Sequence, residues 1–180
     1  MSQTLNMKQK SMKSEPQILN SVWAMLKDRE DIKHIHQLCK LGANHITFMG
    51  RVGEGVIAPI YAETKTIRVY RDELTNDFLV YGNLSKELGI NYHFFGNEIN
   101  KWNPHDDDGD SSYTDILVLE FEKEEQTIIA VDKYKHLART FLLIHNTQNI
   151  HEELELRLQG FFEVAYQDGK GFTVFTKTKS

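Results

Sequence analysis

The sequence predicts an α+β protein with a mainly antiparallel sheet built from hairpins, preceded by two N-terminal helices. Three observations lead to this prediction. Apolar residues recur at helical spacing before residue 42, and apolar runs of strand length dominate after residue 45. Most of these runs are joined by short stretches of Gly or charged residues. Short connections favour antiparallel pairs, because parallel neighbours need a long crossover.

The first helix is expected to begin at Ser14. Ser14 and Gln17 have the spacing of a capping box, and Pro16 suits the first turn of a helix. A second helix is expected between the segment 28–31, which contains three acidic residues, and Gly42. Its apolar stripe consists of Ile32, Ile35 and Cys39.

The chain after His45 is expected to form short strands with a few helices between them. The strand segments are 46–52, 56–61, 66–70, 90–95, 115–122, 127–131, 140–145, 161–167 and 172–177. Gly53, Glu54 and Gly55 indicate a tight hairpin turn, and the polar, mostly charged residues 123–126 indicate a second, solvated one. Further helices are expected at 74–82, 84–88 and 152–159, and residues 96–112 form the longest loop.

The domain organisation follows from this order of elements. Residues 1–13 are polar and without periodicity, which indicates a flexible tail, and residues 14–180 are expected to form a single globular domain. A helix pair that leads into a hairpin resembles small-molecule sensor folds of the PAS and GAF kind. The resemblance implies a sensor-like layering of helices on an antiparallel sheet.

Composition argues against several classes of function. The 26 acidic and 21 basic residues give a formal charge of −5, which disfavours a phosphate backbone as the main partner, so nucleic acid is not expected. Cys39 is the only cysteine, so no intramolecular disulfide can form, and this favours the cytoplasm. No apolar run has the length of a membrane helix, so no membrane association is expected.

Two His-x-Thr triplets are the strongest candidates for catalysis. His45 and Thr47 form the first, and His145 and Thr147 form the second. Residues i and i+2 of a strand point to one face, so each triplet would present an imidazole beside a hydroxyl. Two such pairs across one cleft could act on a phosphodiester, with one His as the base and the other as the acid.

This pair of triplets resembles the two-histidine phosphoesterase family, which hydrolyses cyclic phosphodiesters and RNA ends. The resemblance covers six residues and implies a metal-independent phosphodiesterase whose catalytic residues are the two His and the two Thr. An apolar residue usually follows each Thr in that family. Phe48 fits this pattern and Gln148 departs from it. A second departure is that two helices replace the strand expected ahead of the first triplet.

Two further patterns resemble metal sites. On a strand, His34-Ile35-His36 would resemble the metal-binding pair of rolling-circle nickases, with Tyr134 as the nucleophile. The segment is expected to be a helix, however, where residues i and i+2 lie about 200° apart and cannot share one metal ion. The acidic loop 105–112 offers oxygen ligands to a hard cation. It is not an EF-hand loop. Counted from Asp106, Ser111 stands at position six, where an EF-hand has Gly, and Leu117 stands at position twelve, where it has Glu. No metal ligand is assigned from either pattern.

The interpretation favoured by the sequence is a non-catalytic regulatory or sensor-like domain, and the alternative is the phosphodiesterase. The 96–112 loop would bind a small ligand or a protein, with a homodimer as one such assembly, through Trp102 and His105. No cofactor is expected, because no Gly-rich phosphate loop with a known spacing is present.

Overall fold

The fold is described from a computed structural model of the chain. It describes residues 17, 19–96, 113–146 and 151–178. No helix within these residues combines the length and the apolarity that a membrane crossing requires.

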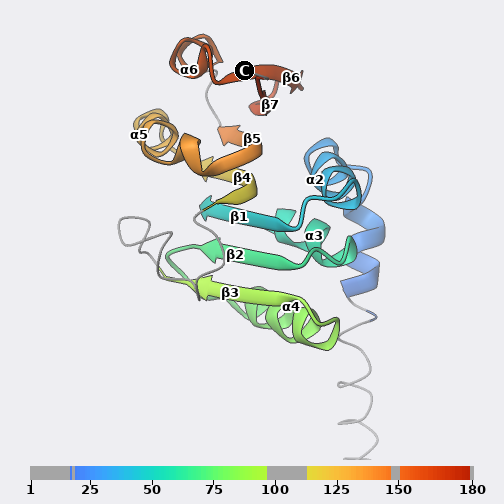
Figure 1. Ribbon diagram of the computed structural model, residues 1–180. Helices are drawn as coiled ribbons and strands as arrows, with labels where there is room; N and C mark the ends of the chain where they lie inside the picture. Colours follow the sequence, from blue (N-terminus) through green and yellow to red (C-terminus); the bar gives the residue numbers. More distant parts are fainter. Residues whose placement is uncertain (1–16, 18, 97–112, 147–150, 179–180) are drawn as a thin grey trace, which may run out of the picture.

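A seven-stranded sheet in the order β3-β2-β1-β4-β5-β7-β6 forms the centre of the protein (Figure 1). Five neighbouring strands are parallel, and β7 pairs antiparallel with both β5 and β6. The strands are β1 His45–Gly50, β2 Thr66–Tyr70, β3 Asn91–Phe95, β4 Thr114–Phe121, β5 Ala138–Asn146, β6 Phe162–Gln167 and β7 Phe172–Lys177. The prediction of an α+β protein with a mainly antiparallel sheet is therefore wrong, and the protein is α/β.

Two segments expected to be strands are helices, and they account for the error. Residues 56–61 fall within η1 (Glu54–Val56) and α3 (Ile57–Tyr61), and residues 127–131 fall within α5 (Glu124–Tyr134). Each of these helices lies between two parallel strands, as a crossover connection does. The turns expected at 53–55 and 123–126 are thus strand-to-helix turns rather than hairpin turns.

Burial explains why α3 does not show a helical pattern in the sequence. Its residues Ile57, Ala58, Pro59 and Ile60 are all buried, so no polar face alternates with an apolar one. Pro59 fits because it lies near the start of the helical segment, where a missing N–H breaks no hydrogen bond. A short helix enclosed on all sides cannot be told from a buried strand by periodicity.

Helices cover both faces of the sheet. Residues 19–26 are helical and, with α2 (Glu30–Lys40), α3 and α4 (Asn76–Glu87), pack on one face around residues such as Ile46, Val69 and Val118. On the other face, α5 and α6 (His151–Leu158) pack around residues such as Met49, Leu119 and Ile144. Figure 1 shows this three-layer arrangement. The sensor-like PAS or GAF layering is excluded, since those expectations required an antiparallel sheet.

The remaining described elements agree with the sequence in type, although two predicted helices prove to be one. The predicted second helix is α2, the helices expected at 74–82 and 84–88 are one helix, α4, and the helix expected at 152–159 is α6. The last hairpin is confirmed, with β6 and β7 paired antiparallel across the turn 168–171. Residues 97–112 of the expected long loop lie outside the described residues.

The strand order creates a switch point between β1 and β4. From β1 the chain moves outward to β2 and β3, and it then returns to place β4 on the other side of β1. The arrowheads of β1, β2 and β3 point to the same edge of the sheet in Figure 1. In open α/β sheets, ligands bind outside the carboxyl ends of the strands at such a switch point.

Candidate functional site at the carboxyl edge of the sheet

Residues 50–55 form a glycine-rich turn from β1 into the following helix. The first glycine of the Gly50-Arg51-Val52-Gly53-Glu54-Gly55 segment has a φ of +102°. A Cβ atom at Gly50 would lie 2.1 Å from the carbonyl oxygen of Glu120 on β4. The Arg51 N–H donates a hydrogen bond of 2.6 Å to that same oxygen. Only glycine fits at position 50, because β1 leaves the sheet in contact with β4.

The other two glycines of the turn have different surroundings. A Cβ atom at Gly53 would meet no protein atom within 4 Å, so the backbone borders open space there. A Cβ atom at Gly55 would lie 3.6 Å from the side chains of Ile35 and Phe48, which places Gly55 against the core. The turn therefore packs on one side and leaves its backbone accessible on the other.

Glu120 occupies the carboxyl end of β4 beside this turn. It pairs in register with Gly50 on β1 and with His145 on β5. Burial raises the pKa of Glu120, while the charge that His145 carries when protonated and a hydrogen bond from the Gly53 backbone N–H oppose that rise. The turn and the neighbouring strand are thus tied together through one partly desolvated carboxylate.

Asp31, at the start of α2, joins that helix to the end of β5. Its carboxylate receives hydrogen bonds from Arg29 at 2.7 and 2.9 Å, and its Oδ2 lies 3.2 Å from Nε2 of His145. Burial alone would raise the pKa of Asp31, but the hydrogen bonds from His145 and Arg29 and their charges hold it well below its usual range. Asp31 therefore stays ionised beside the imidazole.

The turn of the β6–β7 hairpin closes the other side of this region. Asp168 accepts hydrogen bonds from the backbone N–H groups of Lys170 (2.7 Å) and Phe172 (3.0 Å). Gly171 has a φ of +108°, and a Cβ atom there would lie 1.9 Å from the carbonyl oxygen of Asn146. The hairpin turn is fixed directly against the end of β5.

Two cavities meet at these residues. One encloses about 460 Å³, and its lining is Arg29, Glu30, Asp31, Glu120, His145, Tyr166, Asp168, Lys170 and Phe172. The second encloses about 370 Å³, and its lining is Arg51, Glu120, Phe121, Glu122, His145, Asn146 and Lys170. Glu120, His145 and Lys170 line both. Together they form a charged depression along the carboxyl ends of β1, β4 and β5.

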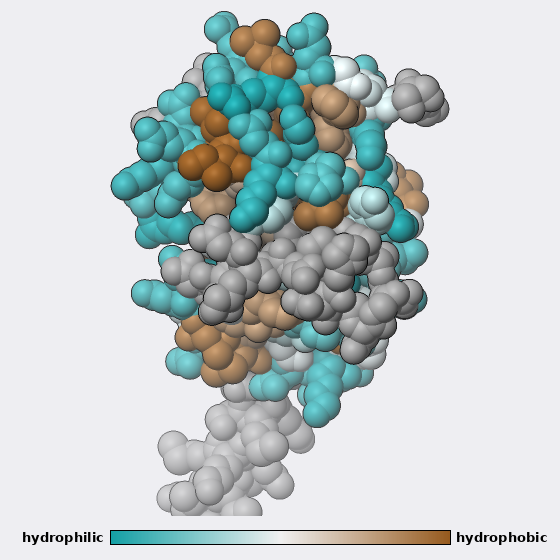
Figure 2. Space-filling model, turned by 60° about the vertical axis from the view of Figure 1, so that its left-hand side comes forward, coloured by the Kyte–Doolittle hydropathy of each residue, from teal (hydrophilic) through white to brown (hydrophobic). Residues whose placement is uncertain are grey.

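The surface around this edge is mainly polar. Figure 2 brings forward the side toward which the arrowheads of Figure 1 point, and hydrophilic residues predominate there among those that are coloured. A depression lined mainly by charged residues suits a small charged molecule better than an apolar partner surface.

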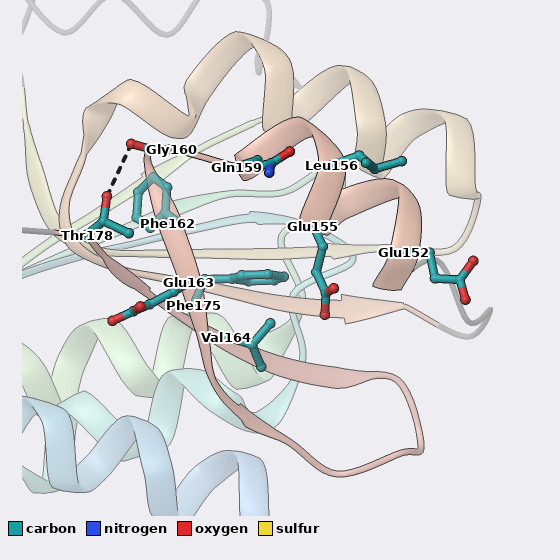
Figure 3. A pocket seen from close by; sticks show the side chains of 10 residues that line it. All are labelled: Glu152, Glu155, Leu156, Gln159, Gly160, Phe162, Glu163, Val164, Phe175 and Thr178. Atoms are coloured by element: carbon teal, nitrogen blue, oxygen red, sulfur yellow. Dashed lines mark hydrogen bonds between the residues drawn. The ribbon is translucent and has the colours of Figure 1, made fainter.

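A larger cavity of about 780 Å³ lies elsewhere, between α6 and strands β6 and β7 (Figure 3). Acidic side chains, among them Glu152, Glu155 and Glu163, line it together with Leu156 and Val164. It borders the edge strand β6, on the other side of β7 from the switch point. No group of three potential metal ligands occurs within the described residues, here or elsewhere.

The structure separates the two His-x-Thr triplets. His45 begins β1 and His145 lies near the end of β5. The two strands are parallel, with β4 between them, so the two His stand at opposite edges of the sheet. The two His also point to different faces of the sheet. Residues at even spacing along a strand share a face, so His45 points to the α5 side with Met49, and His145 points to the α2 side with Leu143. Thr47 is buried on β1 with His45, and Thr147 lies outside the described residues. The phosphodiesterase interpretation is therefore wrong.

The other predicted site residues either lie outside the described residues or stand apart from one another. Trp102 and His105 lie outside the described residues, as does the acidic loop 105–112. His34 packs on Tyr166 with ring centroids 4.1 Å apart, whereas His36 packs on Trp23 at 4.9 Å. Tyr134 is buried in the core on the other face of the sheet. The nickase-like arrangement is absent from these described positions.

No functional role was assigned from the sequence to most residues of this charged site. Asp31, Glu120 and the glycines of the 50–55 turn carried no assigned role, although His145 did. One signal was available: a strand that ends in three closely spaced glycines, followed by a second strand with the acidic Asp72 and Glu73 just beyond it. That order is typical of a dinucleotide-type βαβ unit.

Comparison with known proteins agrees with this topology. No family model and no curated sequence matches the chain. A solved structure from Streptococcus agalactiae, described as a protein of the NADB-Rossmann superfamily, matches with a TM-score of 0.53 and 10% identity over 82% of this chain and 67% of that one. The ribosomal protein L11 methylase of Lactobacillus delbrueckii subsp. bulgaricus matches with a TM-score of 0.52 and 11% identity over 82% and 78%.

A third structure matches nearly the whole chain. It is the 1,6-didemethyltoxoflavin-N1-methyltransferase of Burkholderia thailandensis, solved with 1,6-didemethyltoxoflavin and S-adenosylhomocysteine bound. It has a TM-score of 0.51 and 9% identity over 99% of this chain and 90% of that one. These likenesses establish a Rossmann-like α/β fold whose strand order is typical of S-adenosylmethionine-dependent methyltransferases. They overturn the interpretation as a non-catalytic sensor-like domain.

Proposed function

We propose that this protein is a methyltransferase that uses S-adenosylmethionine as the methyl donor. One observation carries the proposal: a glycine-rich turn with an open backbone at Gly53 lies at the β1–β4 switch point, beside the carboxylate of Glu120. The strand order, with its antiparallel β7, supports the same assignment. When bound, S-adenosylmethionine would supply a methyl group activated by a sulfonium centre.

The turn after β1 fits a donor of this kind sterically. A side chain at Gly53 would project into open space next to the carboxyl edge, and this is space that a ligand can occupy. Glycine also lets a ligand approach the backbone closely. The spacing departs from the familiar G-x-G-x-x-G pattern, since the glycines here stand at positions 50, 53 and 55.

The charges along the edge fit the donor as well. S-adenosylmethionine carries a sulfonium and an ammonium group, and Glu120 offers a partly buried carboxylate close to the turn. A carboxylate in a partly desolvated site attracts a cation more strongly than one in water. Binding of a cation there would also offset the burial that raises the pKa of Glu120.

The end of β2 supplies acceptors for a ribose. Asp72 and Glu73 are exposed and follow Tyr70, the last residue of β2. In dinucleotide-binding folds an acidic residue roughly 20 positions after the glycine turn accepts hydrogen bonds from ribose hydroxyls. Asp72 stands at the matching place relative to Gly50.

Calorimetric titration with S-adenosylhomocysteine, the product of the donor, tests the proposal on the full chain. We expect saturable binding to the wild type. Gly53→Val should weaken binding by at least about tenfold, or ~1.4 kcal/mol, because its side chain fills the open space by the turn. The melting temperature should change little, because a Cβ atom at this position meets no protein atom within 4 Å.

Glu163→Gln is the matched control. Glu163 is exposed on β6 and lines the separate cavity of Figure 3. This variant should bind S-adenosylhomocysteine as the wild type does. Absence of binding to the wild type, or equal weakening by Gly53→Val and Glu163→Gln, would rule out a donor site at the β1 turn.

A further inference from the structure

We propose that the cavity beside β5 is the acceptor site of the transferase, that it takes a small aromatic hydroxyl compound, and that His145 is its general base with Asp31 as the positioning residue. This inference rests on the proposed function, because it supplies the second substrate of the same reaction. It draws on residues of α2, β5 and the β6–β7 hairpin, which the donor assignment does not use.

His145 lies at a suitable separation from the donor turn. Gly50, Glu120 and His145 form one row across β1, β4 and β5. Neighbouring strands lie about 4.8 Å apart, so the Cα atoms of Gly50 and His145 are separated by roughly 10 Å. That separation leaves room for a donor over the turn and for an acceptor against His145.

Asp31 fixes the imidazole for proton transfer. It contacts Nε2 of His145 at 3.2 Å, which leaves Nδ1 as the nitrogen that can take a proton. Arg29 holds the carboxylate in place through two hydrogen bonds. A carboxylate that orients an imidazole and stabilises its protonated form is the arrangement that general-base catalysis needs. Asp31 is buried, whereas the side chain of His145 keeps 27% of its surface exposed.

Two aromatic side chains stand among the charged residues of the cavity wall. Phe172 packs on His145 with ring centroids 4.7 Å apart, and Tyr166 lies next to it at the cavity wall. The volume of about 460 Å³ lies within the range of small-molecule sites. An aromatic hydroxyl combines a ring that can lie beside such side chains with a proton that an imidazole can remove.

The step balances with the two substrates alone. Nδ1 of His145 takes the hydroxyl proton while the acceptor oxygen attacks the methyl carbon of the sulfonium. The new O–C bond forms as the C–S bond breaks, and the electron pair of that bond stays on sulfur. The products are the methyl ether, neutral S-adenosylhomocysteine and an imidazolium that Asp31 stabilises. The proton then leaves to water.

The test compares two acceptors at one pH. Wild type and His145→Gln are incubated with S-adenosylmethionine carrying a labelled methyl group and with either phenol or 4-nitrophenol at about pH 8, above the ordinary pKa of an imidazole. Phenol is mostly un-ionised there and needs a base, whereas 4-nitrophenol is already ionised. We expect His145→Gln to lower kcat for phenol at least about 100-fold and kcat for 4-nitrophenol less than about tenfold. His136→Gln, at an exposed position in η3 (Lys135–Leu137), is the control and should change neither.

Asp31→Asn tests the positioning role. It should lower kcat for phenol more than kcat for 4-nitrophenol at the same pH, because the acceptor that is already ionised needs no base. Equal losses for the two acceptors would mean that Asp31 only supports the structure.

Each outcome decides the matter. Failure to bind S-adenosylhomocysteine would remove the proposed function itself. Binding of S-adenosylhomocysteine without transfer to either phenol would overturn the acceptor class alone. Equal losses for both acceptors in His145→Gln would overturn the role of His145 as the base.

Discussion

Nε2 of His145 and Oδ2 of Asp31 lie 3.2 Å apart and connect the end of strand β5 to the start of helix α2. This contact carries a stability prediction because the pKa of Asp31 is lowered in the folded protein, through hydrogen bonds from His145 and Arg29 that outweigh burial. A lowered pKa means that the ionised carboxylate stabilises the fold at pH values above its unfolded pKa, and that this stabilisation is lost as the pH falls.

Asp31→Asn should therefore destabilise the protein at neutral pH by about 1.5–3 kcal/mol, the usual range for hydrogen bonds to a charged group. The difference from the wild type should shrink as the pH is lowered below 3.8, the ordinary pKa for Asp. Urea denaturation at several pH values measures it. A difference that stays constant between neutral pH and the acid side of that value would contradict the assigned ion pair.

Glu120→Gln should have the opposite effect. Burial raises the pKa of Glu120 in the folded state, so the wild type loses stability as the pH rises past the ordinary value of 4.5. The amide that replaces the carboxylate is neutral and avoids this loss, while its oxygen can still accept the Gly53 N–H. We expect the variant to have a higher melting temperature than the wild type at neutral pH, and no gain below the ordinary pKa. A lower melting temperature at neutral pH would show that the carboxylate is structural.

Gly50 and Gly53 should respond differently to the same substitution. Gly50→Ala places a Cβ atom 2.1 Å from the carbonyl oxygen of Glu120, at a φ of +102°, and should destabilise the protein by about 1–3 kcal/mol. Gly53→Ala meets no protein atom within 4 Å and should be nearly neutral for folding. Differential scanning calorimetry of the two variants distinguishes them. Equal destabilisation would mean that the β1 turn packs differently.

The sequence identified most elements but not how they connect. Apolar runs of strand length and the turn residues between them were sufficient to predict β1, β2, β3, β4 and β5 as strands. The two crossover segments, Val56-Ile57-Ala58-Pro59-Ile60-Tyr61 and Thr127-Ile128-Ile129-Ala130-Val131, are rich in β-branched residues, whose local preference is for strands. Tertiary packing against the sheet overrides that preference. Because these two helices were interpreted as strands, the predicted connections were hairpins and the predicted sheet was antiparallel.

The site was harder to predict because its residues come from distant segments. Nothing in the local sequence around Asp31 indicates that it meets His145 from the other half of the chain. The pairing of the two His-x-Thr triplets failed for the same reason, because a triplet specifies a shared face but not which end of the sheet it occupies. The sequence did single out His145 as a residue of interest, though for a different chemistry.

The most direct test of the proposed donor site is a titration of ¹⁵N-labelled protein with S-adenosylhomocysteine, followed through the backbone amide signals. A ligand over the β1 turn should shift the Gly53 amide and its neighbours in the 50–55 turn the most, with smaller shifts near Glu120. Shifts that concentrate instead around Glu155 and Val164, at the cavity between α6 and β6, would contradict a donor site at the switch point, as would an unchanged spectrum.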